Sequence, residues 1–454
     1  MTLPAFAGSD VVTLPTAPRS LRERALADDV RFILAVFVDL NGKPCAKLVP
    51  VSAADELEAG ELGFAGFAAG LIGQHPHDAD LIAVPDLDSY APIPFVREGL
   101  AIVHCDPYVE GEPWPFAPRV ILKRALSRLA ERGLSAKVGA EVEYFLVDRD
   151  ENGRLTAADA KDEGLRSCYD ARGVTRMYDH LAAVSDAMNA LGWGNYANDH
   201  EDAPGQFEQN FAYDEALVTA DRVITLRYLI GMLAEQRGMT ATFMPKPFSD
   251  RAGSGLHFHL SLWEDDAPVF PGSADERGLG LSDLAYSFVA GMLDHAPGLQ
   301  LFLAPSVNSY KRRGATTSAS GATWSPKHAT YGGNDRTHFI RVPDGNRIEL
   351  RAADGSANPY LALAAVVHAG LDGIERDADP GDPCGPGEFR ESSAVLPRTL
   401  LHAVQSLRDD AVLREALDGG RGVADYFADA KEDEFLGWHN TVTEWELDRY
   451  LTAY

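Results

Sequence analysis

Three short segments, far apart in the chain, place charged or metal-binding side chains at alternate positions with apolar residues between them. They span residues 137–147, 255–262 and 347–351. Because successive side chains of a β-strand point to opposite faces, each segment predicts a strand with an apolar back and a polar front. A sheet built from the three strands would gather carboxylates, imidazoles and guanidiniums on one surface.

That predicted surface has the chemistry of a metal and anion site. Its side chains come from Glu141, Glu143, His257, His259, Ser261, Arg347, Glu349 and Arg351. Carboxylates and imidazoles bind divalent metal ions, and arginines among them bind phosphate or carboxylate groups. A lone Glu-Val-Glu strand is usually only a solvated face, so the prediction depends on the whole set. The set indicates a metal-dependent enzyme.

Composition narrows the class of partner and the compartment. The net charge of −27 should repel nucleic acid, and 45% hydrophobic content over 454 residues is enough for two or three cores. The four cysteines are scattered without a CxxC pair, which argues against a zinc cluster or a disulfide framework. The chain shows neither an apolar run of roughly 18 residues nor a signal-peptide pattern. We expect a cytoplasmic protein with no nucleic-acid or membrane partner.

The order of patterns along the chain predicts an arm and two domains. Residues 1–20 hold three prolines and read as a loose arm, and residues 21–112 read as a small β-rich domain. Within it, strands at 32–40 and 45–51 should form a hairpin through Asn41-Gly42, a dipeptide typical of tight turns.

The remainder, residues 113–454, predicts a larger α+β domain around an antiparallel or mixed sheet. Residues 110–118, with three prolines and a glycine, are the expected linker between the two domains. Apolar residues at helical spacing predict helices at 119–132, 175–191, 216–237, 282–295 and 359–374.

Six motifs follow one another along the chain. They are Gly-Ala-Glu-Val-Glu-Tyr-Phe (139–145), His-Glu-Asp-Ala-Pro-Gly-Gln-Phe-Glu (200–208), Lys-Pro-Phe (246–248), Gly-Ser-Gly-Leu-His-Phe-His-Leu-Ser (253–261), Asn-Ser-Tyr-Lys-Arg (308–312) and Arg-Ile-Glu-Leu-Arg (347–351). In this collinear order they resemble the motifs of the glutamine synthetase family. The sequences of residues 320–326 and 334–338 resemble those of the type III subgroup, which includes glutamate–methylamine ligases. The resemblance implies a β-grasp-like N-terminal domain and a catalytic domain with a curved antiparallel sheet.

The resemblance also implies an activity and its cofactors. The activity would be ATP-dependent ligation of glutamate to ammonia or a small primary amine through γ-glutamyl phosphate. Two or three Mg²⁺ or Mn²⁺ ions would serve each site, and active sites would lie between subunits of a homo-oligomer, most simply a dodecamer. One ion would be held by Glu143, Glu201 and Glu208, and another, bridging the phosphates of ATP, by Glu141, His257 and Glu349.

Matched positions give the remaining implied roles. Glutamate and the transferred phosphate would be held by Gly253, Arg312, Arg336 and Arg351, with Arg336 and Arg351 also catalytic. The nucleotide side would be formed by His259, Ser261, Arg341 and Arg347. Surface solvation is the alternative interpretation of each arginine, most of all for Arg336 in its loop.

Three departures from the family concern the acceptor and the nucleotide. Ammonia-using members carry Asp-Gly-Ser-Ser in the small domain, where this chain has Phe64-Ala65-Gly66-Phe67, and a later glutamate is replaced by Thr316, Thr317 and Ser318. Loss of two carboxylates weakens the binding of a small cation and favours an alkyl amine. The turn at 342–346 is short and lacks the family's ATP-side lysine, which predicts weaker nucleotide binding.

Two alternatives remain open at this level. A non-catalytic family member could bind glutamate or nucleotide without turnover, although such a protein would not need every metal ligand. The guanido-kinase relatives fit less well because their reactive cysteine motif is not found in the sequence.

Overall fold

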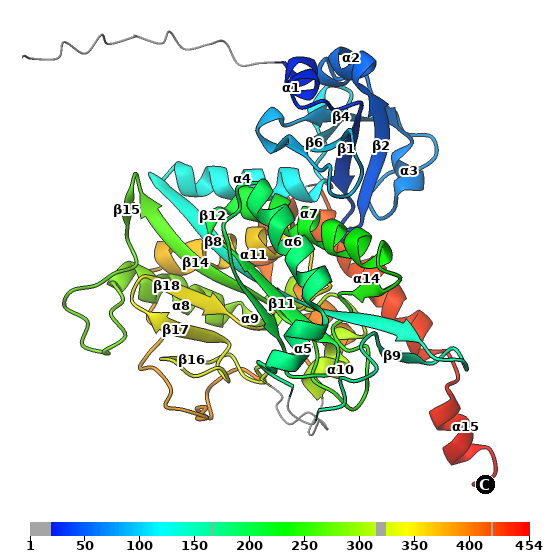
Figure 1. The fold of residues 1–454 in the computed structure, drawn as a ribbon. Coiled ribbons are helices and arrows are strands. Elements are labelled where there is room, and N and C mark those ends of the chain that lie inside the picture. Colours follow the sequence, from blue (N-terminus) through cyan, green and yellow to red (C-terminus); the bar gives the residue numbers. More distant parts are fainter. Residues whose placement is uncertain (1–19, 165–166, 315–323, 419–420) are drawn as a thin grey trace, which may run out of the picture.

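The computed structural model describes residues 20–164, 167–314, 324–418 and 421–454. The expected arm, apart from Ser20, lies outside the described residues, as does the acceptor-related stretch 316–318. Two sheets organise the rest, a small one near the N-terminus and a larger one beneath it (Figure 1). The expected α+β fold class is confirmed.

The small sheet has the order β2-β1-β6-β4-β3, with β1 parallel to β6. The hairpin prediction is confirmed, because β1 and β2 pair antiparallel with Val38 opposite Pro44 and Gly42 takes a positive φ of 79° in the turn. Its elements are α1 (Leu21–Ala27), β1 (Phe32–Val38), β2 (Pro44–Pro50), α2 (Ala54–Glu58), β3 (Gly63–Phe64), α3 (Gly66–Ala69), β4 (Leu81–Pro85), β5 (Ala91–Pro92), β6 (Leu100–Val109) and β7 (Glu112–Pro113).

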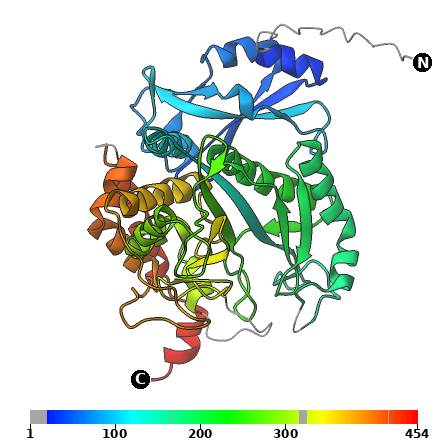
Figure 2. The same ribbon diagram turned by 90° about the vertical axis from the view of Figure 1, so that its left-hand side faces the viewer.

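The expected linker is structured. Its β7 pairs with the end of β6, and the indole of Trp114 donates a 2.7 Å hydrogen bond to the carbonyl of Ile72. One face of the small sheet forms its own core with α1 and α2, while Val36 and Ile102 on the other face join the core of the larger part. Figure 2 shows the small sheet above the helices of the larger part. The domain boundary at residue 112 stays a prediction.

The larger sheet has the order β10-β11-β8-β14-β18-β17-β16, antiparallel except between β16 and β17. The three segments singled out by alternation are therefore neighbouring strands, as predicted. Its strands are β8 (Leu134–Arg149), β9 (Leu155–Ala157), β10 (Asn195–His200), β11 (Gln206–Phe211), β12 (Asp214–Glu215), β13 (Thr240–Thr242), β14 (Leu256–Glu264), β15 (Ala267–Pro268), β16 (Tyr331–Gly332), β17 (Ile340–Asp344) and β18 (Arg347–Leu350).

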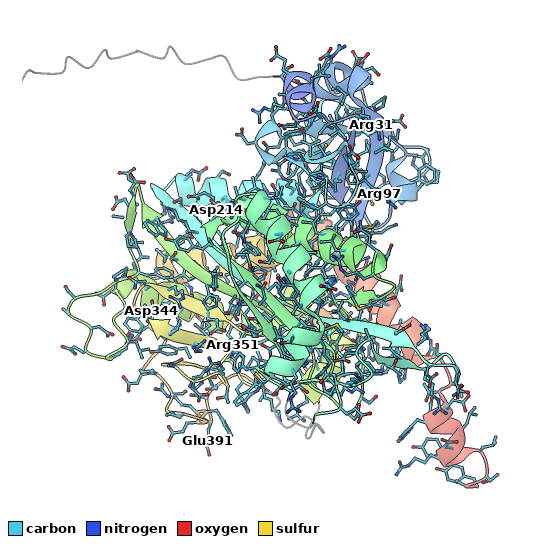
Figure 3. The ribbon with its side chains drawn as sticks, viewed as in Figure 1. Arg31, Arg97, Asp214, Asp344, Arg351 and Glu391 are labelled. Carbon is cyan, nitrogen blue, oxygen red and sulfur yellow. The ribbon has the colours of Figure 1, made fainter. Side chains whose placement is uncertain are left out.

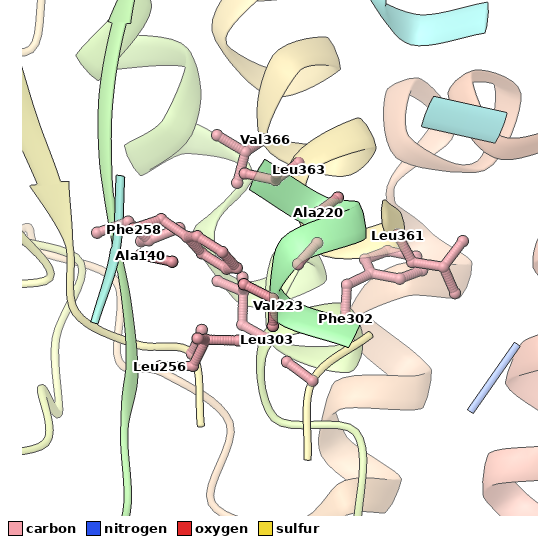
Figure 4. Close-up of a cluster of buried hydrophobic side chains, with 14 of the residues drawn as sticks. Ala140, Ala220, Val223, Leu256, Phe258, Phe302, Leu303, Leu361, Leu363 and Val366 are labelled. Atoms are coloured by element: carbon pink, nitrogen blue, oxygen red, sulfur yellow. The ribbon is translucent and has the colours of Figure 1, made fainter. Parts of the chain in front are cut away.

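Apolar side chains on the back of the larger sheet pack against helices. Ala140 of β8 and Phe258 of β14 are buried against Val223, Leu303 and Val366 (Figure 4). Burial of this face fixes which side chains of the same strands point forward, since a strand alternates its faces. The helices are α4 (Pro118–Ala130), α5 (Ala171–Arg176), α6 (Tyr178–Ala190), α7 (Ala216–Glu235), α8 (Asp283–Asp294), α9 (Ala296–Leu303), α10 (Ser309–Gly314), α11 (Pro359–Glu375), α12 (Leu400–Asp409), α13 (Ala411–Asp418), α14 (Val423–His439) and α15 (Glu444–Tyr450).

Four of the five predicted helices are confirmed within a few residues, and the one expected at 175–191 is corrected. It is two helices, α5 and α6, separated at Met177. The first begins earlier than predicted because the Asp170 side chain accepts hydrogen bonds from the backbone of Arg172 and Gly173, which is an N-cap. No helix within the described ranges is both long and apolar enough to span a membrane.

Candidate active site

The polar front of the larger sheet is set by strand register. Glu141 of β8 lies opposite His257 of β14, and His259 lies opposite Glu349 of β18. On the other side of β8, Glu143 pairs with Glu208 of β11. The apolar back and the register together bring these acidic and imidazole groups from four strands onto one surface.

Glu141 is the centre of the imidazole contacts. His257 donates from Nδ1 to its carboxylate at 3.0 Å, and His259 donates from Nε2 at 2.8 Å. Burial acts to raise the pKa of Glu141, but these hydrogen bonds outweigh it and hold the pKa well below its ordinary value. Ligand atoms of Glu141, Glu208 and His257 lie within 4.8 Å of one another, as do those of Glu141, His259 and Glu349.

Two further carboxylates are crowded by like charge. Burial and the neighbouring Glu143 raise the pKa of Glu201 to about 8. Burial and the nearby glutamates, Glu141 first among them, raise the pKa of Glu208 well above its ordinary value. Buried acids that repel one another in this way are stabilised by a cation between them. The donor set therefore fits a divalent metal that prefers oxygen ligands with some imidazole.

The loop that carries Glu201 is held by a buried ion pair. His200, directly before it, lies 2.7 Å from Asp162 through Nε2 and 2.8 Å from the carbonyl of Glu201 through Nδ1. Asp162 also accepts a 2.6 Å hydrogen bond from the backbone N–H of Gly205. Three segments are thus joined at one point, which positions Glu201.

The arginines lie around the carboxylates. Arg341 and Arg351 donate to the two oxygens of the fully buried Glu349. Burial acts to raise the pKa of Glu349, but the charges of His257, Arg351 and His259 lower it. Buried Arg312 donates from Nη1 to the Ala353 carbonyl at 3.2 Å.

Gly253 lies where no side chain fits. A Cβ atom there would lie 2.3 Å from the Pro245 carbonyl oxygen and 2.9 Å from the Cγ atom of Arg312. The residue therefore keeps open the approach to Arg312, in agreement with a position where backbone meets a ligand.

A cavity of about 500 Å³ opens onto this front. Most of the candidate residues line it: Glu141, Glu143, Glu201, Glu208, Gly253, His257, Arg312, Arg336, Arg341 and Arg351. Four others lie outside its lining: His259, Ser261, Arg347 and Glu349. Its size suits a small-molecule site.

The four residues outside the lining have partners of their own. Ser261 accepts a 2.9 Å hydrogen bond from the indole of Trp263. Arg347 donates from Nε to Nδ1 of His259 at 3.2 Å and forms an ion pair with Asp344 across the β17–β18 turn. Arg347 is therefore partly neutralised in the short turn noted from the sequence.

Sequence reasoning missed several residues of the cavity. Buried Gln206 donates from Nε2 to Glu143 at 3.0 Å and to the Gly253 carbonyl at 3.2 Å. Its alternation with Glu208 on β11 was the signal that would have found it. The others that line the cavity are Cys168, Tyr169, Asp202, Lys246, Ala252, Trp324 and Ser325.

The segment that departs from the family lies elsewhere. Ala65 and Phe67 are exposed on the surface of the small domain, and neither lines the cavity. Phe64 instead packs edge-to-face on Phe37 at 5.0 Å. The structure therefore places Ala65 and Phe67 outside the lining of this chain's own cavity.

Comparison with known proteins defines the class. The family model described as glutamine synthetase, catalytic domain, matches residues 115–450, so the chain belongs to that family. It is a ligase that forms carbon–nitrogen bonds.

Individual relatives cover nearly the whole chain. A glutamine synthetase of Rhizobium leguminosarum bv. phaseoli is 40% identical over 427 residues, which are 93% of this chain and 97% of the relative. The glutamate–methylamine ligase of Methyloversatilis universalis is 38% identical over 444 residues, covering 96% and 99%. A solved structure of a GmaS/ADP complex has a TM-score of 0.89 at 43% identity, covering 95% of this chain and 99% of that one.

Proposed function

We propose that the chain is an ATP-dependent glutamate–amine ligase that makes a γ-glutamyl amide, with a preference for a small primary amine over ammonia. The observation that carries the proposal is the convergence of acidic, imidazole and guanidinium groups from neighbouring strands on one cavity. The relatives, among them a glutamine synthetase and a glutamate–methylamine ligase, support the reaction class.

Metal ions fit the acidic front because burial, first, and neighbouring carboxylates raise the pKa values of Glu201 and Glu208. Mg²⁺ or Mn²⁺ when bound would neutralise phosphate charge. One ion would be held by Glu143, Glu201 and Glu208, and a second by Glu141, His257 and Glu349.

The arginines supply orientation and charge. Arg312 and Gly253 would hold glutamate so that its γ-carboxylate attacks the γ-phosphorus of ATP, giving γ-glutamyl phosphate and ADP. Arg336 and Arg351 would stabilise the negative charge on the transferred phosphoryl group. The neutral amine then attacks the acyl carbon, phosphate leaves with the C–O bond electrons, and the proton of the amine goes to a base or to water.

On the nucleotide side we assign His259, Ser261, Arg341 and Arg347. Arg341 donates to Glu349, and Arg347 forms an ion pair with Asp344, so these carboxylates compete with ATP for both guanidiniums. That competition supports the expectation of weaker nucleotide binding.

The acceptor preference depends on Ala65. Its exposure, outside the cavity of its own chain, supports a homo-oligomer in which the small domain completes a neighbour's site, and we expect a dodecamer. Without a carboxylate at this position the pocket should bind an alkyl amine better than the compact ammonium ion.

A panel of amines tests the proposal. Phosphate release is measured with ATP, glutamate and either ammonia, methylamine, ethanolamine, a polyamine or an aromatic amine. Wild type should show a higher kcat/KM for methylamine than for ammonia as free base, and Ala65→Asp should move the ratio toward ammonia by about tenfold. Ala68→Asp, on the same exposed helix, is the matched control for charge and should leave the ratio unchanged.

Two outcomes would contradict it. If wild type prefers ammonia and Ala65→Asp does not change that preference, the proposed preference for a primary amine is wrong. No phosphate release with any amine at millimolar Mg²⁺ or Mn²⁺ would leave the alternative, a family member that binds without turnover.

A further inference from the structure

A second cavity, of about 290 Å³, lies next to the active site. It is formed by Arg313 of α10 and by segments 326–328 and 395–398. The two segments pair through their backbones: Leu396 donates to the carbonyl of Lys327 at 3.0 Å, and Ala329 donates to that of Ala394 at 2.8 Å. Backbone pairing makes this wall a built feature of the fold.

The lining of this second cavity is basic. It has four cationic or titratable nitrogen side chains and otherwise prolines and aliphatic residues: Arg313, Lys327, His328, Arg398, Pro326, Val395, Leu396 and Pro397. Its lining, drawn from the described part of the chain, includes no acidic residue. Residues 315–323, which follow α10, contain neither Asp nor Glu in the sequence. In a chain of net charge −27, this local excess of positive charge has no counter-charge in the lining.

Arg313 is the buried member of these groups. It is 6% exposed, and only Nη2 has a hydrogen bond, to the Ala352 carbonyl at 3.1 Å. Nε and Nη1 have no acceptor among the described residues. Burial, first, and the neighbouring Arg312 lower the pKa of Arg313 to about 10, although Tyr310 and Asp354 act to raise it. Two unpaired N–H groups of a buried guanidinium cost free energy, and the charge of an anion in the adjoining cavity would offset part of that cost.

We propose that the second cavity is a binding site for a small dianion, either phosphate or a short dicarboxylate. Guanidinium and ammonium groups in the lining suit two negative charges, since each could make a charge-assisted hydrogen bond. The aliphatic wall formed by Val395 and Leu396 limits the ligand to a compact one. The site goes beyond the proposed ligase activity, which uses the other cavity.

The two cavities share their walls. Arg312 and Ser325 line the active-site cavity, and the next residue in each case, Arg313 or Pro326, lines the second. Phosphate is also a product of the proposed ligase reaction, so it should bind in both places. A test must therefore separate the two.

Calorimetric titration of inorganic phosphate and of succinate into the metal-free full-length protein tests the site. The Arg351→Gln variant is the background, because it weakens anion binding in the active-site cavity. Adding Lys327→Gln and Arg398→Gln, both exposed and tolerant of substitution, should raise the dissociation constant of the bound dianion by about tenfold or more. Whether phosphate or succinate binds more tightly shows which of the two kinds of dianion the site prefers.

The matched control removes the same charge elsewhere. Arg31 and Arg97 are exposed on the small domain, well away from Arg351 (Figure 3). Arg31→Gln with Arg97→Gln should change the dissociation constant by no more than about twofold, as a long-range charge effect. Arg313→Met, which removes the unsatisfied guanidinium, should abolish binding while the far-ultraviolet circular dichroism is kept.

Three results would overturn the proposal. They are no binding of either dianion up to about 10 mM in the Arg351→Gln background, equal binding with and without the two cavity substitutions, or an equal loss in the control pair. Phosphate release in the ligase assay is measured separately, so failure here is distinct from failure of the proposed function.

Discussion

Binding of a divalent metal should release protons from the active site. At pH 7 a carboxyl group with a pKa of about 8, such as Glu201, is roughly nine-tenths protonated. A metal ion requires it as a carboxylate. Titration of Mn²⁺ into the metal-free protein at pH 7 should therefore release about one proton per site from Glu201.

The same shift fixes the sign of the stability change with pH. A Glu201 pKa raised from 4.5 to about 8 corresponds to roughly 5 kcal/mol of differential interaction. Because the pKa of Glu201 is raised on folding, its contribution to the free energy of unfolding is complete below pH 4.5 and is lost as the pH rises through 8. Mn²⁺ should consequently raise the melting temperature more at pH 8.5 than at pH 6.

Calorimetry in two buffers of different ionisation enthalpy measures the proton count. Glu201→Gln should release about one proton fewer than wild type at pH 7, and the release by wild type should fall by nearly one proton between pH 7 and pH 9, because Glu201 is then already ionised without metal. Asp250→Asn, at an exposed carboxylate outside the cavity lining, is the control and should match wild type. A release below half a proton at pH 7, or one that does not change with pH, would refute the reasoning.

Three further outcomes follow from other contacts. Gln206→Ala removes the amide that holds Glu143. Phosphate release should show a kcat about 10- to 100-fold lower, and calorimetry should show little change in melting temperature. A decrease in kcat below about twofold counts against a positioning role for Gln206. Asp221→Asn weakens two 2.9 Å hydrogen bonds from buried Arg119, so the free energy of unfolding measured in urea should fall by about 3 kcal/mol. An unchanged urea midpoint would rule out a stabilising role for this pair. His295 lies between Asp410 and Asp372, and its pKa is raised although burial acts to lower it. Its contribution to the free energy of unfolding is therefore complete below pH 6.5 and is lost as the pH rises through the folded pKa. His295→Gln should have a lower melting temperature than wild type at pH 6 but not at pH 9, and an equal difference at both pH values would contradict this.

Alternation within strands predicted much of the site because it follows from backbone geometry alone. The pattern around Glu141 and His257 required only that apolar residues face a core, so the strands and their polar faces could be inferred. The order of the strands could not be inferred, and the structure supplies it. The early start of α5 was missed because the Asp170 cap precedes the apolar spacing from which the helix was predicted.

Contacts between distant segments were beyond prediction from sequence. The pairing of His200 with Asp162 depends on a tertiary approach across 38 positions of chain. Arg341 was assigned to the nucleotide side, yet it donates to Glu349 across the β17–β18 pair. Such exchanges among charged neighbours depend on side-chain geometry that a motif does not encode.

The register of the paired strands determines where insertions and deletions can be tolerated in such a protein. A deletion of one codon within β8 or β14 would exchange the front and back of that strand, burying its carboxylates or imidazoles and exposing its core residues. The β17–β18 turn carries no such restriction, since it can gain or lose residues while the paired strands keep their phase. Insertions and deletions among descendants should accordingly cluster in that turn, and the affinity for ATP should vary with them while the metal ligands stay in place.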